Sequence, residues 1–147
     1  MGEDVRVLYH FSEDRGIERF VPHVPVTNPG YPPAVWAIDA EHSPLYWFPR
    51  DCPRAAVWTS ADLTHKTPRR IHTVERAWKK RLRTTTVFCY GLPTEPFVPW
   101  PEADGQFIAT GTVVPISVEP LGDLVALHEA AGIELALLRH RRNRVSW

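Results

Sequence analysis

The chain has 147 residues, of which 44% are hydrophobic, 23% charged and 11% aromatic. This length suits one domain with its own core, and the composition is not that of a disordered chain. No apolar run approaches the roughly 18 residues of a membrane span, and charged residues interrupt residues 1–20, unlike a signal peptide. We therefore expect a single domain over residues 1–147, no membrane association and, with both cysteines reduced, a cytoplasmic location.

The net charge is zero, but the charges are unevenly distributed. Residues 1–51 carry four basic and eight acidic side chains, whereas residues 66–83 carry eight basic side chains and the single acidic residue Glu75. A basic face of this kind is either a solvated surface or a contact for nucleic-acid phosphates. The candidate nucleic-acid contacts are Lys66, Arg69, Arg70, Lys79, Lys80 and Arg83.

Seven short segments are predicted to be strands, because they gather β-branched, aromatic and other apolar residues between turn residues. They are residues 5–9, 34–38, 55–59, 84–90, 106–110, 112–118 and 133–138. Prolines cluster in residues 20–33 and 93–101, which are predicted to be loops because proline fixes φ and lacks an N–H donor.

Helices are predicted at fewer places. In residues 68–82, apolar side chains recur every three or four residues, which is the spacing of one helix face. Residues 123–130 form a helix that Gly132 ends, and residues 39–48 hold a helical turn with Ser43 as its cap. Consecutive strands without regular strand–helix alternation predict an α+β domain with a mostly antiparallel or split sheet and two or three helices.

Two short motifs carry side chains suited to ligand binding. His10, Phe11 and Ser12 follow the first predicted strand, where an imidazole at a sheet rim offers one donor and one acceptor. Ser43 and Tyr46 lie one turn apart after the second predicted strand, so the Tyr46 ring could stack on a planar ligand. The alternatives are a histidine that satisfies local backbone groups and an aromatic side chain that fills the core.

In this order, the two motifs resemble the first two signature elements of the ADP-ribosyltransferase superfamily. There, a histidine followed two positions later by serine or threonine ends the first strand, and a short strand, a loop and an S-x-x-Y segment follow. The chain also resembles, through about residue 138, an uncharacterised bacterial family of short proteins with the motifs LYHFSE and VWAID-EH-PLYWFPRDCPR.

The superfamily resemblance implies a split sheet that binds NAD as a substrate in the cleft between its halves. It also implies a role for each matched residue. His10 would bind a ribose hydroxyl, Ser12 with the neighbouring backbone of Phe11 would hold the nicotinamide carboxamide, and Ser43 would belong to the same site. Tyr46 would stack on the nicotinamide ring. The reaction would transfer ADP-ribose to an acceptor through an oxocarbenium-like centre.

The chain departs from the superfamily at its third signature element. A glutamate usually opens a late strand there, and the alignment of GQFIATGTVVP puts Gln106 in its place. An amide can bind a hydroxyl but carries no charge to stabilise a developing cation. The expected catalytic set is therefore His10, Tyr46 and Gln106, with transfer retained, slowed, altered or lost.

Other readings stay open beside this one. A non-catalytic module could bind a nucleotide in the same cleft or nucleic acid through residues 66–83, and an interaction protein would expose tryptophans in its proline-rich loops. Cys52, between Arg50 and Arg54, is a weaker candidate nucleophile, because no histidine is tied to it by spacing. The cysteines and histidines show no paired metal-ligand spacing, so we predict no metal site.

Overall fold

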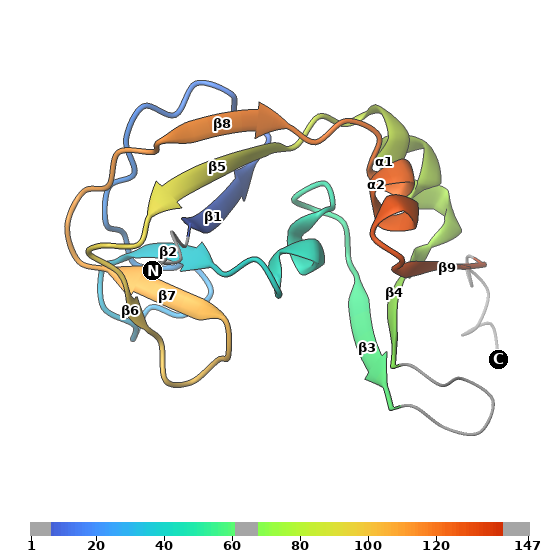
Figure 1. Ribbon diagram of the computed structural model, residues 1–147, viewed down its shortest axis with the longest axis horizontal. Coiled ribbons are helices and arrows are strands. Elements are labelled where there is room, and N and C mark those ends of the chain that lie inside the picture. Colours follow the sequence, from blue (N-terminus) through green and yellow to red (C-terminus); the bar gives the residue numbers. More distant parts are fainter. Residues whose placement is uncertain (1–6, 61–67, 140–147) are drawn as a thin grey trace, which may run out of the picture. The chain divides into compact units, whose positions relative to one another are not determined.

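The computed structural model describes residues 7–60 and 68–139 of the chain. It is an α+β fold with mostly antiparallel sheets and two α-helices, as predicted (Figure 1). The chain divides into two compact units, each built from two separate segments: residues 1–46 with 87–120, and residues 47–86 with 121–147. The single domain stays a prediction.

The first unit contains a six-stranded sheet in the order β6-β7-β2-β1-β5-β8, with antiparallel pairing throughout. Its strands are β1 (Val7–Ser12), β2 (Val35–Ile38), β5 (Phe88–Pro93), β6 (Val98–Pro99), β7 (Gln106–Ala109) and β8 (Ser117–Pro120). The predicted strands at 34–38 and 106–110 are confirmed as β2 and β7. Those at 84–90 and 112–118 begin too early, because β5 and β8 start only at Phe88 and Ser117.

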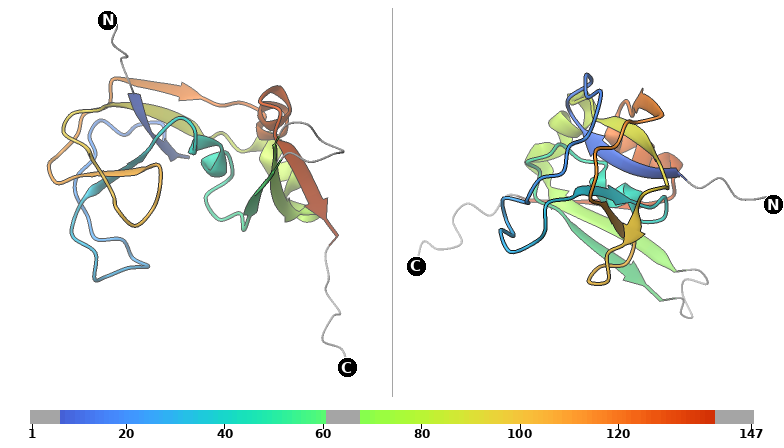
Figure 2. Two further views of the ribbon diagram at one scale, coloured as in Figure 1. Left: turned by 60° about the horizontal axis from the view of Figure 1, so that its bottom comes forward. Right: turned by 90° about the vertical axis from the view of Figure 1, so that its left-hand side faces the viewer.

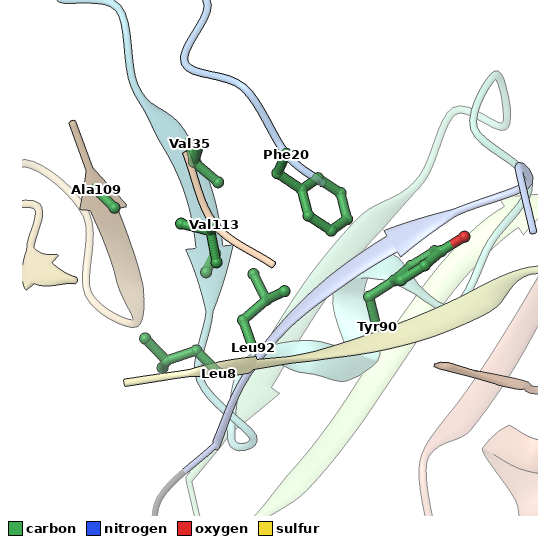
Figure 3. Close-up of a cluster of buried hydrophobic side chains, with 8 residues drawn as sticks. Leu8, Phe20, Val35, Tyr90, Leu92, Ala109 and Val113 are labelled. Atoms are coloured by element: carbon green, nitrogen blue, oxygen red, sulfur yellow. The ribbon is translucent and has the colours of Figure 1, made fainter. Parts of the chain in front are cut away.

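One face of this sheet carries the hydrophobic core of the unit. Figure 3 shows side chains from β1, β2, β5 and β7 pointing toward Phe20 and Val113, which come from two loops. Phe20 and Val113 exchange backbone hydrogen bonds of 2.8 and 2.9 Å, so these loops are fixed to the sheet. The buried members of the core cluster are Leu8, Phe20, Val35, Ala37, Tyr90, Leu92, Ala109 and Val113.

The first strand runs further than the sequence indicates. It continues to Ser12 because β5 pairs with it from Val7 to Ser12, so His10 lies within the strand and not beyond its end. The Ser12 hydroxyl accepts the N–H of Asp14 at 3.0 Å, in a short turn.

The helical turn expected in residues 39–48 is the 3₁₀ helix η1 (Ser43–Tyr46). Ser43 begins this helix and does not cap it. Asp39 caps the turn just before it, because an Asp39 carboxylate oxygen accepts the N–H of His42 at 2.9 Å. The Ser43 hydroxyl is buried and donates to the Asp39 carbonyl at 2.7 Å.

The second unit holds a three-stranded sheet in the order β3-β4-β9, which Figure 2 shows from two further sides. The strands are β3 (Ala55–Thr59), β4 (Arg69–Glu75) and β9 (Glu134–Leu138), and β4 is antiparallel to β3 but parallel to β9. Its helices are the 3₁₀ helix η2 (Arg76–Trp78), α1 (Lys79–Thr84) and α2 (Leu124–Ala130). The predicted strands at 55–59 and 133–138 are thereby confirmed.

The predicted helix over residues 68–82 is wrong. Residues 69–75 form the central strand β4, and helical structure begins only at Arg76, with η2 followed by α1. His72 and Val74 are buried while their neighbours are not, which is the two-residue period of a strand. The β-branched residues Ile71, Thr73 and Val74 favour that strand, and the spacing from Ile71 to Val74 matched a helix by chance.

Helix α2 has the signals that the sequence predicts. The Asp123 carboxylate accepts the N–H groups of Val125 and Ala126 at 2.9 and 3.2 Å, and Gly132 adopts a φ of 74° just beyond the end. Neither this helix nor any other in the described residues is long and apolar enough to cross a membrane.

Two fully buried histidines face each other in the second unit. His128 Nδ1 donates to the Leu124 carbonyl at 2.7 Å, so its Nε2 accepts the Nδ1–H of His72 at 2.9 Å. This arrangement leaves His72 Nε2 buried, with no hydrogen-bond partner in the described residues. Burial, followed by the charges of His128, Arg70 and Arg54, lowers the pKa of His72 to about 4. Burial likewise lowers the pKa of His128.

Because the folded pKa of His72 lies below the unfolded value, the unfolded state binds the extra proton as the pH falls. We expect the free energy of unfolding to decrease between about pH 6.5 and 4. His72→Gln keeps an N–H donor for His128 but does not titrate, so the loss between pH 7 and 5 should be smaller by about 2 kcal/mol. Urea titrations at pH 7 and at pH 5, monitored by tryptophan fluorescence, measure the free energy of unfolding. His23→Gln, at an exposed position, should behave as the wild type, and equal losses in all three proteins would contradict this origin.

Candidate functional site

Two of the predicted site residues meet although they lie 60 positions apart. Gln106 opens β7 and Tyr46 ends η1, and the Gln106 side-chain amide donates a hydrogen bond of 2.9 Å to the Tyr46 hydroxyl. Both side chains belong to partly buried residues. The bond leaves the Tyr46 O–H as a donor and adds the amide oxygen of Gln106 as an acceptor.

A third predicted residue joins this pair. The rings of Phe11 and Tyr46 are parallel to within 4°, with their centroids 6.2 Å apart. The ring centroid of Phe11 also lies 6.4 Å from that of Tyr9, on the same strand. Parallel aromatic faces at a partly buried site can stack a planar ligand ring.

The strand register explains why these side chains share a face. Tyr9 lies opposite Ile38, and Ile38 lies opposite Gln106. Directly opposed residues of antiparallel strands point to the same side, and every second residue of a strand does so too. Phe11 therefore lies on the face of Gln106, whereas Leu8 and His10 lie on the face that carries the core.

His10 is thus separated from the other three residues. Its Nδ1 lies 3.2 Å from the Trp36 carbonyl of β2, and its ring centroid lies 4.6 Å from that of Phe20. Within the described residues, the pair Tyr9–Ile38 alone joins β1 to β2, so the imidazole bonds to β2 at the point where the two strands diverge (Figure 1). In this position His10 helps to hold the two parts of the sheet together.

The two predicted serines have their hydroxyls in local turns. Ser12 bonds to the backbone of Asp14, and the buried Ser43 bonds to the backbone of Asp39. The structure does not bring these hydroxyls to the Tyr46–Gln106 hydrogen bond.

A carboxylate–imidazole pair, which the sequence reasoning missed, borders the same bond. His42 Nδ1 lies 2.7 Å from an Asp39 carboxylate oxygen, and each side chain is about one-third exposed. The order Asp-x-x-His directly after a strand was a signal, because an aspartate capping a turn can reach the side chain three residues later. Glu41 lies close by, and the three ligand-type side chains Asp39, Glu41 and His42 have their ligand atoms within 4.8 Å of one another.

Gly105 fixes the position of His42 beside β7. It has a φ of 83°, and a Cβ added there would overlap the His42 ring. Its carbonyl also accepts the N–H of Asp39 at 3.0 Å. The Asp39–His42 turn therefore packs directly on the residue before Gln106.

The weaker candidate Cys52 lacks the environment of a nucleophile. It is buried, and its thiol lies 3.5 Å from the Pro53 carbonyl. Burial raises the pKa of the Cys52 thiol, an effect that Arg54 and Arg81 reduce but do not reverse. The thiolate that nucleophilic attack requires is disfavoured there.

The candidate nucleic-acid contacts do not lie on one helix face, because residues 68–82 are not one helix. Arg69 on β4 forms an ion pair with Glu134, and the guanidinium of Arg70 lies 4.9 Å from the Trp58 ring. Lys66 lies outside the described residues, as do the tail positions 140–147. Lys79, Lys80 and Arg83 are exposed on α1.

The tryptophans of the first unit are partly covered. Trp36 and Trp100 pack edge to face with their ring centroids 5.2 Å apart, and Tyr31 lies 5.8 Å from Trp36 and 5.1 Å from Trp100. Because Tyr31 and Trp100 come from the two proline-rich loops, this contact holds both loops against β2. It therefore covers part of both tryptophan rings.

No curated protein and no solved structure matches the chain. The match to a protein family covers residues 9–143, which include every residue of the site described above. The chain belongs to this family of unknown function, DUF6886.

Proposed function

We propose that the protein binds NAD at Phe11, Tyr46 and Gln106 and breaks the bond between ribose and nicotinamide. The observation that carries this proposal is the hydrogen bond between Gln106 and Tyr46 beside the parallel ring of Phe11. The resemblance to ADP-ribosyltransferases assigns these three residues to one site, although they come from three separate parts of the chain.

The side chains have the chemistry that this ligand requires. The nicotinamide ring stacks on Tyr46 or Phe11, and the Tyr46 hydroxyl and Gln106 amide bind the polar groups of the carboxamide or of the ribose. Orientation by such groups supplies a large part of the catalysis in reactions through a cationic sugar centre.

We further propose that the sheet is split in the sense of that superfamily, with NAD lying between its halves. A single residue pair joins β1 to β2, whereas six pairs join β1 to β5 and four join β2 to β7. This weak junction supports a separation at that point. The binding of a ribose hydroxyl by His10 remains a separate prediction, since His10 lies at the junction and not beside Gln106.

A second candidate function has its own supporting observation. Residues 76–83 expose five cationic side chains without an intervening carboxylate: Arg76, Lys79, Lys80, Arg81 and Arg83. Arg81 also lies 4.4 Å from the Trp78 ring. Such a segment suits nucleic-acid phosphates, and binding that weakens steeply with salt, in a protein without affinity for NAD, would favour this function.

Calorimetric titration with NAD tests the first proposal. We expect saturable binding by the wild type, and about 5- to 150-fold weaker binding by Tyr46→Ala, because one stacked ring contributes on the order of 1–3 kcal/mol. Tyr46→Phe separates the two contributions of this residue, since it keeps the ring and removes only the hydroxyl, and should lose less affinity than Tyr46→Ala.

His23→Ala, at an exposed position, should bind as the wild type does. His10→Ala tests the ribose contact separately, because unchanged affinity would exclude that contact and leave the stacking site intact. If the wild type does not bind NAD at millimolar concentration, the proposal is wrong.

Gln106→Glu tests what the missing charge does to catalysis. A carboxylate at this position can accept the Tyr46 O–H and stabilise the cationic ribose centre, so nicotinamide release should rise by about 10²-fold. Chromatography of the released nicotinamide measures this rate. Gln106→Ala, which also removes the wild-type amide, should show no rise. If Gln106→Glu releases nicotinamide no faster than the wild type, position 106 does not face the reacting ribose.

A further inference from the structure

The Asp39–His42 pair has the form of an oriented base. One carboxylate oxygen of Asp39 accepts both the backbone N–H of His42, at 2.9 Å, and the ring Nδ1–H, at 2.7 Å. Because Nδ1 carries the proton in this arrangement, Nε2 carries the lone pair. Both side chains are about one-third exposed, so the imidazole is accessible to a ligand.

The pair lies next to the proposed NAD site. His42 packs on Gly105, and Gln106 follows Gly105 in the chain. Gln106 in turn bonds to Tyr46, which comes four residues after His42 on the same turn. The imidazole and the stacking ring are therefore held on one short segment, against the start of β7.

A cap alone does not explain the geometry. Capping a helical turn requires only that the Asp39 carboxylate accept the backbone N–H. The additional bond to the ring fixes the orientation and the tautomer of His42, as carboxylates do for catalytic imidazoles. Gly105 leaves the space that the ring occupies, at a backbone conformation that few other residues adopt.

The reaction needs such a group, because the Gln106 amide cannot take up a proton. An acceptor O–H must lose its proton as its oxygen bonds to the ribose. An imidazole is the side chain best suited to this step near neutral pH.

We propose that His42, oriented by Asp39, is the general base that activates the acceptor, an inference that rests on the proposed NAD-cleaving function. The bond from ribose C1′ to the nicotinamide nitrogen breaks, and its electron pair leaves with nicotinamide. The oxygen of water or of another hydroxyl acceptor bonds to C1′, and its proton passes to Nε2 of His42. Asp39 is the positioning residue in this step.

The central experiment separates binding from turnover in His42→Ala. We expect NAD affinity within about twofold of the wild type, and nicotinamide release slower by about 10²- to 10⁴-fold. Free imidazole added to the assay should restore part of the rate in His42→Ala but not in Tyr46→Ala. A merely structural role for His42 would not produce this rescue.

Two further variants test the orientation of the ring. Asp39→Asn keeps an oxygen for the cap but removes the carboxylate charge, so it should bind NAD and lose at least about tenfold in rate. Gly105→Ala should displace His42 and slow nicotinamide release by a similar factor. Its matched control is Gly122→Ala, which has a comparable φ of 77° but no atom within 4 Å of the added Cβ, and which should keep the wild-type rate.

A spectroscopic measurement tests the pair without turnover. At a pH where the ring is neutral, ¹⁵N NMR should show the Nδ1–H tautomer for His42 in the wild type, and a larger share of the Nε2–H tautomer in Asp39→Asn. An Nε2–H ring in the wild type would contradict the assigned orientation.

The outcomes distinguish this inference from the proposed function. Absence of NAD binding in the wild type overturns the function itself, together with the role of His42. Binding with equal nicotinamide release in the wild type and His42→Ala overturns only the base. Binding with no release by the wild type overturns the proposed cleavage together with the base, and leaves only the NAD-binding part of the proposed function. Release that stops with a chelator and returns with a divalent ion would instead assign Asp39, Glu41 and His42 to a metal, and would also overturn the base.

Discussion

The register at one residue pair, Tyr9 with Ile38, determines the composition of the candidate site. This pair alone joins β1 to β2. Through Ile38 and its partner Gln106, it sets which side chains of three strands share a face. A slip of one residue would move Phe11 to the face opposite Gln106 and expose Leu8 in its place. The buried cluster around Leu8 therefore specifies the site on the other face, because it makes such a slip unfavourable.

His10 has a structural role at this junction between β1 and β2. Two strands that separate after one pair leave backbone groups without their usual partners, and buried groups of this kind are costly. The imidazole of His10 bonds to the Trp36 carbonyl at that point. A histidine at this position is thus consistent with a split sheet even if it never touches a ligand.

Local sequence patterns predicted the elements whose start and stop signals lie next to them in the chain. The strand at β2 lies between Pro33 and Asp39, and α2 has a capping aspartate and a terminating glycine in adjacent sequence. Residues 69–75 could not be assigned in this way, because their spacing fits a helix face as well. The parallel partner β9, some 60 residues later, makes this segment a strand. Pairing with β9 and with the nearer strand β3 decides between the two local patterns there.

The candidate site shows the same limit. Tyr46 and Gln106 were expected together through a family resemblance, whereas the separation of His10 from them depends on strand register, which composition and spacing do not give. Asp39 and His42 were within reach of local reasoning as a capping pattern. The buried pair His72 and His128 was not, because the two residues lie 56 positions apart and meet only through tertiary packing.

The direction of one hydrogen bond decides what the site offers to a ligand. Since the Gln106 amide donates to the Tyr46 oxygen, the phenol proton points to another acceptor, and the amide presents its own oxygen. A glutamate would reverse this bond, taking the phenol proton and adding a charge, and it could also take up the proton of an acceptor. In the reaction that we propose, glutamine separates the two tasks: the amide and the phenol would orient the ligand, and the proton would pass to another group. The adjacent Asp39–His42 pair is the group in that neighbourhood with the chemistry to receive it.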